Sequence, residues 1–173
     1  MFADDTIRNV RNSLAASILC EHVLHPPAVM IDEKVRLALL SVPSVTIGQV
    51  ESWQRKAFDE GKSLYSVAFS DESVREPSLV KALAGALLVT PVSLEGFKSK
   101  PKLLEIFPPE ICRRHLALAI GLKQNEGVMT VFVGLADPLN VDTLEELAKY
   151  TDYPIVPLLA GPADLKRAIA RVL

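Results

Sequence analysis

The chain has 173 residues, of which 49% are hydrophobic, so it is long enough to bury one substantial core or two smaller ones. Its 19 lysines and arginines stand against 21 aspartates and glutamates, which leaves a net charge of −2. This balance lacks the basic footprint that nucleic acid or an anionic membrane requires of a binding protein, so we expect neither as a partner. No apolar run approaches the roughly 20 residues that span a bilayer, so we expect no membrane insertion.

The positions of the cysteines and the first residues of the sequence indicate the cellular compartment of the protein. Cys20 and Cys112 lie far apart in the sequence, and the first residues show no basic region followed by an apolar stretch and a cleavage site. We therefore expect a cytoplasmic protein.

The first half of the chain is predicted to consist of short helices. Apolar residues at a spacing near 3.6 predict an amphipathic helix over residues 4–24, which Pro26 and Pro27 end. Asp32 is the candidate N-cap of a second helix that reaches the break at Pro43. Three further helices are expected: one capped by Thr46 and stopped by Gly61, a short one at about 62–70, and one opened by Pro77.

The pattern changes near residue 88. Residues 88–92 are expected to be extended, and Pro108 with Pro109 opens a short helix that runs through His115. Two strands follow, joined by a hairpin turn at 124–127, and then a helix, a strand and a closing helix. The predicted strands are 116–122, 128–135 and 155–159, and the predicted helices are 141–150 and 163–172. This order implies a small sheet that helices cover on one face.

A weak internal repeat lies in the helical half. At an offset of 29 residues, apolar residues recur in five pairs: Val35 and Leu64, Leu39 and Ala68, Val45 and Val74, Val50 and Leu79, Ala57 and Ala86. Two similar helical units in tandem would produce this pattern. Coincidence between amphipathic helices is the alternative, which periodicity alone leaves open.

The predicted fold class is α+β, with an N-terminal helical subdomain of short helices followed by a compact α/β subdomain (β-β-α-β-α) with a small three-stranded sheet. The predicted domains are an N-terminal helical extension at 1–30, a helical tandem-repeat subdomain at 31–95, and the α/β subdomain at 96–173.

The sequence contains no glycine-rich phosphate loop and no motif of a nucleophilic or zinc-dependent enzyme. Five cysteines and histidines fall in two tracts that could in principle supply the four ligands of a zinc ion: Cys20, His22 and His25 in one, and Cys112 and His115 in the other. Their spacing is not that of a zinc finger, and helix ends and half-buried positions give these residues ordinary structural roles. We predict no catalytic residue, no cofactor and no metal.

An acidic group follows the second predicted strand: Asp137, Asp142, Glu145 and Glu146. A metal or a general base at the end of a strand is one interpretation. The other is mechanical, because Asp137 and Pro138 can form a turn and Asn140 or Asp142 can cap the next helix. The two glutamates would then lie in the first turn, where the helix dipole favours acidic side chains. We favour the mechanical interpretation.

The same stretch carries a resemblance to a known family. A strand ends in Ala136-Asp-Pro-Leu-Asn140, a helix with Leu144-x-x-Leu147 follows, and the next strand contains Val-Pro157. Together with the helix Pro-Glu-Ile-Cys-Arg-Arg-His that ends at His115, this order resembles the N-terminal domain of type II secretion and type IV pilus assembly ATPases (GspE/PilB type, MshEN-like). The resemblance covers about residues 109–172.

Members of that family often carry two tandem helical motifs, R-L-G-x2-L-x5-L-x4-L-x3-L-x2-Q, which bind cyclic di-GMP and repeat with the offset found above. Laid on this chain, the motifs run over 34–57 and 63–86. Lys-Val-Arg and Ser-Leu-Tyr replace Arg-Leu-Gly, and alanines replace both glutamines. The apolar positions survive as Leu39, Val45 and Val50 in the first motif and as Leu64, Ala68, Val74, Leu79 and Leu83 in the second. The resemblance implies a degenerate nucleotide site at five positions: Lys34, Arg36, Arg55, Ser63 and Tyr65.

The resemblance implies a non-catalytic docking or regulatory module that binds a secretion or pilus motor ATPase or an inner-membrane platform protein. It implies a cytoplasmic location, or a peripheral one at the inner membrane through such a partner, and weak or no binding of cyclic di-GMP. Two other functions are kept as hypotheses. One is a receptor for cyclic di-GMP or a related nucleotide that uses altered residues, and the other is a small metal-dependent enzyme.

Overall fold

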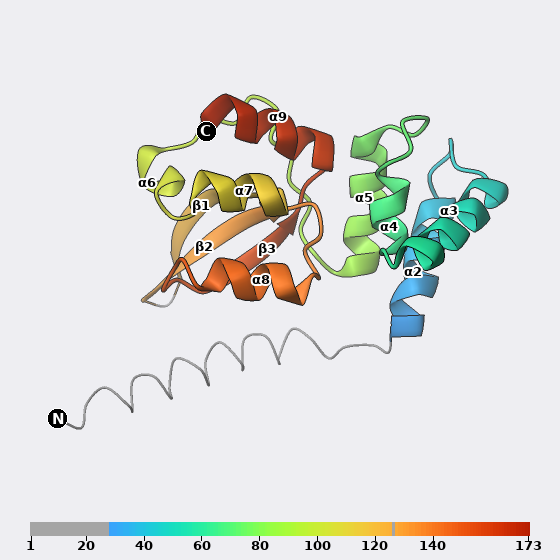
Figure 1. Cartoon of the computed structure of the whole chain (residues 1–173), viewed down its shortest axis with the longest axis horizontal. Coiled ribbons are helices and arrows are strands. Elements are labelled where there is room, and N and C mark those ends of the chain that lie inside the picture. Colours follow the sequence, from blue (N-terminus) through green and yellow to red (C-terminus); the bar gives the residue numbers. More distant parts are fainter. Residues whose placement is uncertain (1–27, 126) are drawn as a thin grey trace, which may run out of the picture. The chain divides into compact units, whose positions relative to one another are not determined.

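The computed structural model describes residues 28–125 and 127–173 (Figure 1). Residues Ile31–Leu173 form one compact unit. Within it we distinguish a helical lobe, residues 31–89, from an α/β lobe, residues 90–173. The helix predicted over 4–24 lies outside the described residues. Within the described ranges, no helix combines the length and the apolar character that crossing a membrane requires.

The helical lobe is built from four helices: α2 (Ala28–Leu40), α3 (Ile47–Glu60), α4 (Leu64–Ala68) and α5 (Glu76–Leu87). The predicted ends of α3 are confirmed, since Thr46 caps it in a capping box with Gln49, and Gly61 ends it in the left-handed conformation. The predicted start of α2 was wrong. The helix begins at Ala28 rather than after Asp32, because residues 28–31 contain nothing that breaks a helix.

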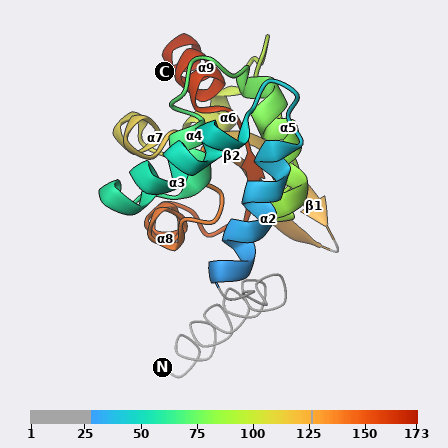
Figure 2. The same cartoon turned by 90° about the vertical axis from the view of Figure 1, so that its right-hand side faces the viewer.

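The repeated apolar positions lie in one core. Four of the five pairs are buried together in a single cluster of α2–α5, and in the fifth pair Ala57 is buried while Ala86 packs against the cluster. Figure 2 shows these helices close to one another. The offset of 29 residues therefore relates positions that share one interior, which two repeated units and two coincidentally similar amphipathic segments would both produce.

The α/β lobe contains seven elements: α6 (Pro101–Leu104), α7 (Pro109–His115), β1 (Ala117–Asn125), β2 (Val128–Leu135), α8 (Val141–Ala148), β3 (Ile155–Leu159) and α9 (Pro162–Val172). The sheet has the order β1-β2-β3, with β1 antiparallel and β3 parallel to β2. The predicted α+β class and three-stranded sheet are confirmed. The short helix α6, a single turn that Pro101 opens, was not predicted.

Three local predictions needed correction. The hairpin is tighter than predicted, because Asn125 pairs directly with Val128 and Gly127 adopts a φ of 86°. Leu88 and Leu116 were expected to be extended, but each ends a helix in the left-handed conformation, with φ of 55° and 46°. A left-handed leucine costs about 1 kcal/mol or more, and in both places it ends the preceding helix where a glycine is commoner.

Helices cover both faces of the sheet, so the prediction of a single covered face was wrong. Ala117 and Ala119 of β1 pack in a core with residues of α6, α7 and α8. Leu118, which points to the other face, packs in a separate core with α9. The helix order alone did not reveal this, because both α8 and α9 follow strands at the same end of the sheet.

Cys112 supplies a test of this packing. Its side chain is buried on α7, and burial raises the pKa of the thiol from 9.0 to about 11. Because the folded pKa is the higher one, the stability that the neutral thiol contributes is present below about pH 9 and is lost as the pH rises toward 11.

In a Cys20→Ser variant, Cys112 is the only thiol. We expect it to react with a disulfide reagent at pH 8 about 100-fold more slowly in the native protein than in urea, because the pKa differs by about two units. Absorbance of the released thiol measures both rates. Equal rates would contradict the buried position of Cys112.

Candidate functional site

The structure separates the five positions that the resemblance assigns to a nucleotide. Lys34 on α2 and Arg55 on α3 are exposed, whereas Arg36 on α2 and Ser63 are half-buried and Tyr65 is buried. Arg36 forms an ion pair with Glu33 at 3.2 Å. Neither Lys34 nor Arg55 has an ion pair or hydrogen bond with another described residue.

Ser63 and Tyr65 come together at the start of α4. The Ser63 hydroxyl caps this helix by accepting a hydrogen bond from the backbone N–H of Ser66. Tyr65 follows in the first turn, with 6% of its surface exposed. Its hydroxyl donates a hydrogen bond to Asp137, 72 residues further along the chain. This bond joins the helical lobe to the α/β lobe.

The environment keeps the Tyr65 hydroxyl protonated. Burial first, and then the charge and hydrogen bond of the Asp137 carboxylate, hold the pKa of Tyr65 far above its ordinary value, while Ser63 acts weakly in the opposite direction. The hydroxyl is therefore a permanent donor at neutral pH.

The favoured mechanical interpretation of the acidic group was incomplete. Asn140 is the cap of α8, accepting from the N–H of Thr143 at 2.9 Å, as predicted. Asp137 does more than shape a turn, because it accepts the hydroxyl of Tyr65. Glu145 and Glu146 lie beyond the first turn of α8, so the predicted dipole role does not apply to them.

The contacts of His115 with Glu146 and Thr143 give this histidine, from one of the two candidate zinc tracts, a structural role. The Nε2 atom of His115 lies 2.9 Å from Glu146, and its Nδ1 atom lies 3.2 Å from the hydroxyl of Thr143. Arg114 pairs with the same glutamate at 2.9 Å. Within residues 28–125 and 127–173, no three histidine, cysteine or acidic side chains are placed to hold a metal ion. Cys20, His22 and His25 lie outside the described residues.

A second bond between the lobes was not visible in the sequence. Glu76, in the first turn of α5, accepts from the backbone N–H groups of Ala163 at 2.8 Å and Asp164 at 3.0 Å. These are the first-turn donors of α9, whose own cap residue, Gly161, has no side chain to satisfy them. Glu76 thus caps a helix of the other lobe, where the dipole favours a negative charge.

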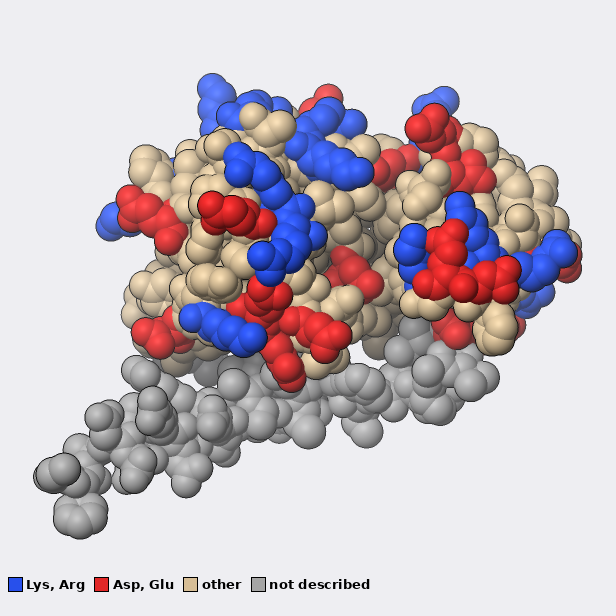
Figure 3. Space-filling view, viewed as in Figure 1, with Lys and Arg blue, Asp and Glu red and all other residues tan. Residues whose placement is uncertain are grey.

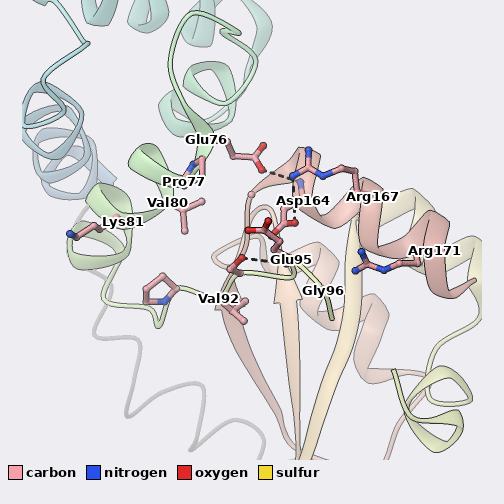
Figure 4. A pocket seen from close by; sticks show the side chains of 13 residues that line it. Glu76, Pro77, Val80, Lys81, Val92, Glu95, Gly96, Asp164, Arg167 and Arg171 are labelled. Carbon is pink, nitrogen blue, oxygen red and sulfur yellow. Dashed lines mark hydrogen bonds and ion pairs between the residues drawn. The ribbon is translucent and has the colours of Figure 1, made fainter. Parts of the chain in front are cut away.

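Gly161 is required for this contact. A Cβ atom at that position would lie 2.0 Å from a carboxylate oxygen of Glu76, so the carboxylate would have to leave. Glu76 also lines a cleft of about 570 Å³ between α5, the segment 91–96 and α9, which Lys81 and Arg171 border (Figure 4). In this cleft Glu76 acts as a helix cap, because both of its carboxylate oxygens already accept backbone N–H groups of α9.

Leu159 completes the seam between the lobes. At the end of β3 it donates its N–H to Thr90 at 2.9 Å and accepts from Val92 at 2.8 Å, which places residues 90–92 of its own lobe parallel to the strand. Its side chain is fully buried in the core of the helical lobe. The burial of Leu159, the Tyr65–Asp137 bond and the capping of α9 by Glu76 are three different interactions that hold the lobes together.

The cap that Glu76 provides can be tested by stability measurements. We expect Glu76→Ala to lower the free energy of unfolding by about 1–2 kcal/mol, since two helix donors lose their acceptor. Glu72→Ala is the matched control, because Glu72 is exposed and has no hydrogen bond or ion pair with another described residue, and its effect should stay within about 0.5 kcal/mol.

Urea titration of Gly161→Ala and of the double variant completes the cycle. Gly161→Ala should destabilise the protein only while Glu76 is present, because its added methyl group acts by displacing that carboxylate. Additive effects of the two substitutions would contradict a shared contact.

Comparison with known proteins agrees with this architecture. A family model described as the MshEN domain matches residues 87–173. The type IV pilus assembly ATPase PilB of Myxococcus xanthus (strain DK1622) is 21% identical over 127 residues, which are 73% of this chain and 22% of PilB. The chain therefore spans about a fifth of the length of that relative.

Two solved structures share the fold. A structure of MshE with cdg has a TM-score of 0.62 at 21% identity, covering 80% of this chain and 98% of that chain. The N-terminal domain of XpsE also has a TM-score of 0.62, at 14% identity, covering 82% of this chain and 95% of that one.

Proposed function

Because this chain belongs to the MshEN domain family, we propose that it is a non-catalytic docking and regulatory module, which binds a secretion or pilus motor ATPase or an inner-membrane platform protein. We propose a cytoplasmic location, or a peripheral one at the inner membrane through that partner. The similarity to a pilus assembly ATPase supports this class of partner.

The observation that carries the proposal is the state of the nucleotide positions. Tyr65 stands where the second family motif has glycine, and its buried side chain is already bonded to Asp137. Arg36 stands at the corresponding glycine of the first motif and is paired with Glu33. Side chains at both positions remove the bare backbone that a phosphate or base could approach closely. The helical scaffold is present, and its ligand groups are changed.

The surface offers features that suit protein partners. On α3, Phe58 is 89% exposed and Ile47 is 62% exposed, although both are large apolar side chains. In the α/β lobe, basic residues gather over α7 and α9 and acidic ones over α8, and Arg114 pairs with Glu146 where the two groups meet (Figure 3). An uneven charge distribution of this kind orients a complementary protein surface.

Binding to purified motor and platform proteins of the native host tests the docking role and identifies the lobe that carries it. We expect Phe58→Ser to weaken capture by about ten-fold or more if the helical lobe docks, because an exposed aromatic anchor is lost. Lys166→Glu should weaken it instead if the α/β lobe docks. Lys149→Ala, an exposed basic residue at the end of α8, is the control. Binding to neither protein would reject the proposed partners.

The second candidate function is a receptor for cyclic di-GMP or a related nucleotide that uses altered residues. It is favoured by the two cations without described partners, Lys34 and Arg55, since an unpaired cation can attract a phosphate.

Calorimetry with cyclic di-GMP separates the two functions. We expect no binding tighter than about 1 mM, that is, less than about 4 kcal/mol of binding free energy, because the ligand positions are occupied or altered. Micromolar binding that Lys34→Ala or Arg55→Ala abolishes, while Lys149→Ala does not, would establish the receptor function instead.

A further inference from the structure

We propose that the cleft between α5 and α9 binds an extended acidic segment of the partner protein, with Arg167 and Arg171 as the groups that contact its carboxylates. The bound segment alternates acidic with apolar residues. This inference rests on the proposed function and deepens it by placing the docking site and naming the chemistry of the segment. None of the five positions that the resemblance assigns to a nucleotide lines this cleft.

The sides of the cleft differ in character. Figure 4 shows α9 on one side, with Arg167 and Arg171 reaching toward the cleft, and α5 on the other, with the segment 91–96 between them. The volume of about 570 Å³ lies within the range of about 300–1,000 Å³ that is typical of binding pockets, so the cleft has room for several side chains. The apolar side chains of the α5 wall and the floor are those of Pro77, Val80, Pro91 and Val92.

Two of the three acids that line the cleft are already bonded within the chain. Both oxygens of Glu76 accept backbone N–H groups of α9. Asp164 accepts the N–H of Leu94 at 2.6 Å with one oxygen, and its other oxygen lies 3.5 Å from Arg167. The third acid, Glu95, is exposed, and its carboxylate has no hydrogen bond or ion pair with another described residue.

The two arginines keep most of their hydrogen-bond donors free. A guanidinium carries five N–H donors. Arg171 uses one nitrogen on the carbonyl of Leu94 at 3.0 Å. Arg167 makes only the long contact with Asp164, and 70% of its side chain is exposed. The free donors suit carboxylates, which a guanidinium binds through two parallel hydrogen bonds.

The spacing of the arginines selects an extended segment. Arg167 and Arg171 are four residues apart on α9, so their backbone positions are separated by about 6 Å along the helix axis. In an extended chain, residues i and i+2 lie about 6.6 Å apart and point to the same side. Acidic residues at alternate positions of the segment therefore reach both arginines, and the residues between them face the apolar wall.

The surroundings of the arginines favour a protein segment over an anionic membrane. Over its whole length, which the structure describes, α9 has no large apolar side chain that is exposed, so it lacks the anchor that a helix at a lipid surface uses. The arginines also border a recess, which a narrow peptide chain can enter and the flat surface of a bilayer cannot.

Fluorescence anisotropy with a labelled peptide tests the site. The peptide has the core Glu-Val-Glu-Val-Glu between glycine-serine flanks, and the unaltered protein should bind it with a Kd of about 100 μM or tighter. Two comparison peptides should bind about ten-fold more weakly or worse: one with the core Glu-Glu-Glu-Val-Val, and one with lysine in place of glutamate. No binding of the alternating peptide, or equal binding of the three, would overturn the proposal.

Substitutions locate the bound peptide, after circular dichroism has confirmed that each variant folds. Arg167→Glu should weaken binding about ten-fold or more, and so should Arg171→Gln, which retains an amide donor for the carbonyl of Leu94. Glu95→Gln should tighten binding about two-fold, because it removes a like charge from the cleft. Lys149→Glu, a charge reversal outside the cleft, is the matched control. Equal affinities of the Arg167→Glu and Lys149→Glu variants would reject the cleft as the binding site.

Capture of purified motor and platform proteins separates this inference from the proposed function. Capture that Arg167→Glu weakens and Lys149→Glu does not supports the cleft as the docking site. Capture that both variants retain rejects the cleft and leaves the docking function standing. Capture of neither protein rejects the proposed partners, and the peptide measurement then decides the cleft by itself. Binding to vesicles of phosphatidylserine and phosphatidylcholine instead of the peptide would overturn the proposal in favour of a membrane surface.

Discussion

The rest of the structure depends on the pairing of Leu159 with residues 90–92. This short parallel contact uses both backbone groups of Leu159, and it fixes where the chain that leaves α5 enters the sheet. The same residue buries its side chain in the core of the helical repeats. One residue is therefore shared by the sheet and by the other lobe's interior, so the register of β3 and the position of α5 are set together.

Once this register is set, two polar groups must face the helical lobe. Because β2 and β3 are parallel, their last residues lie at the same end of the sheet, with Leu135 beside Leu159. Asp137 follows the first of these strands, and Gly161 with the N-terminus of α9 follows the second. The helical lobe supplies the complementary hydrogen-bonding groups, a hydroxyl donor on α4 and a carboxylate acceptor on α5. Neither bond has a local equivalent, since the partners are 72 and 87 residues apart.

This long separation along the chain explains which structural features the sequence could predict and which it could not. Thr46, Gly61, Pro77 and Asn140 mark helix ends because capping and proline geometry act over a few residues, and the repeat revealed the buried positions of the helical lobe. The covering of both sheet faces and the bonds across the seam depend on which elements meet in space. Glu76 looked like an ordinary first-turn acid of α5, and only the glycine at 161 hinted that α9 lacked a cap of its own.

The same physics accounts for the apolar positions at the offset of 29 residues. The paired positions that are buried build one core of the helical lobe, so a polar residue at any of them would be buried without a partner. Ala57 is buried at 7% exposure, where an apolar side chain needs no hydrogen-bond partner. Tyr65 is buried as well, and because a buried hydroxyl needs a partner, the bond to Asp137 is what allows a tyrosine at this position.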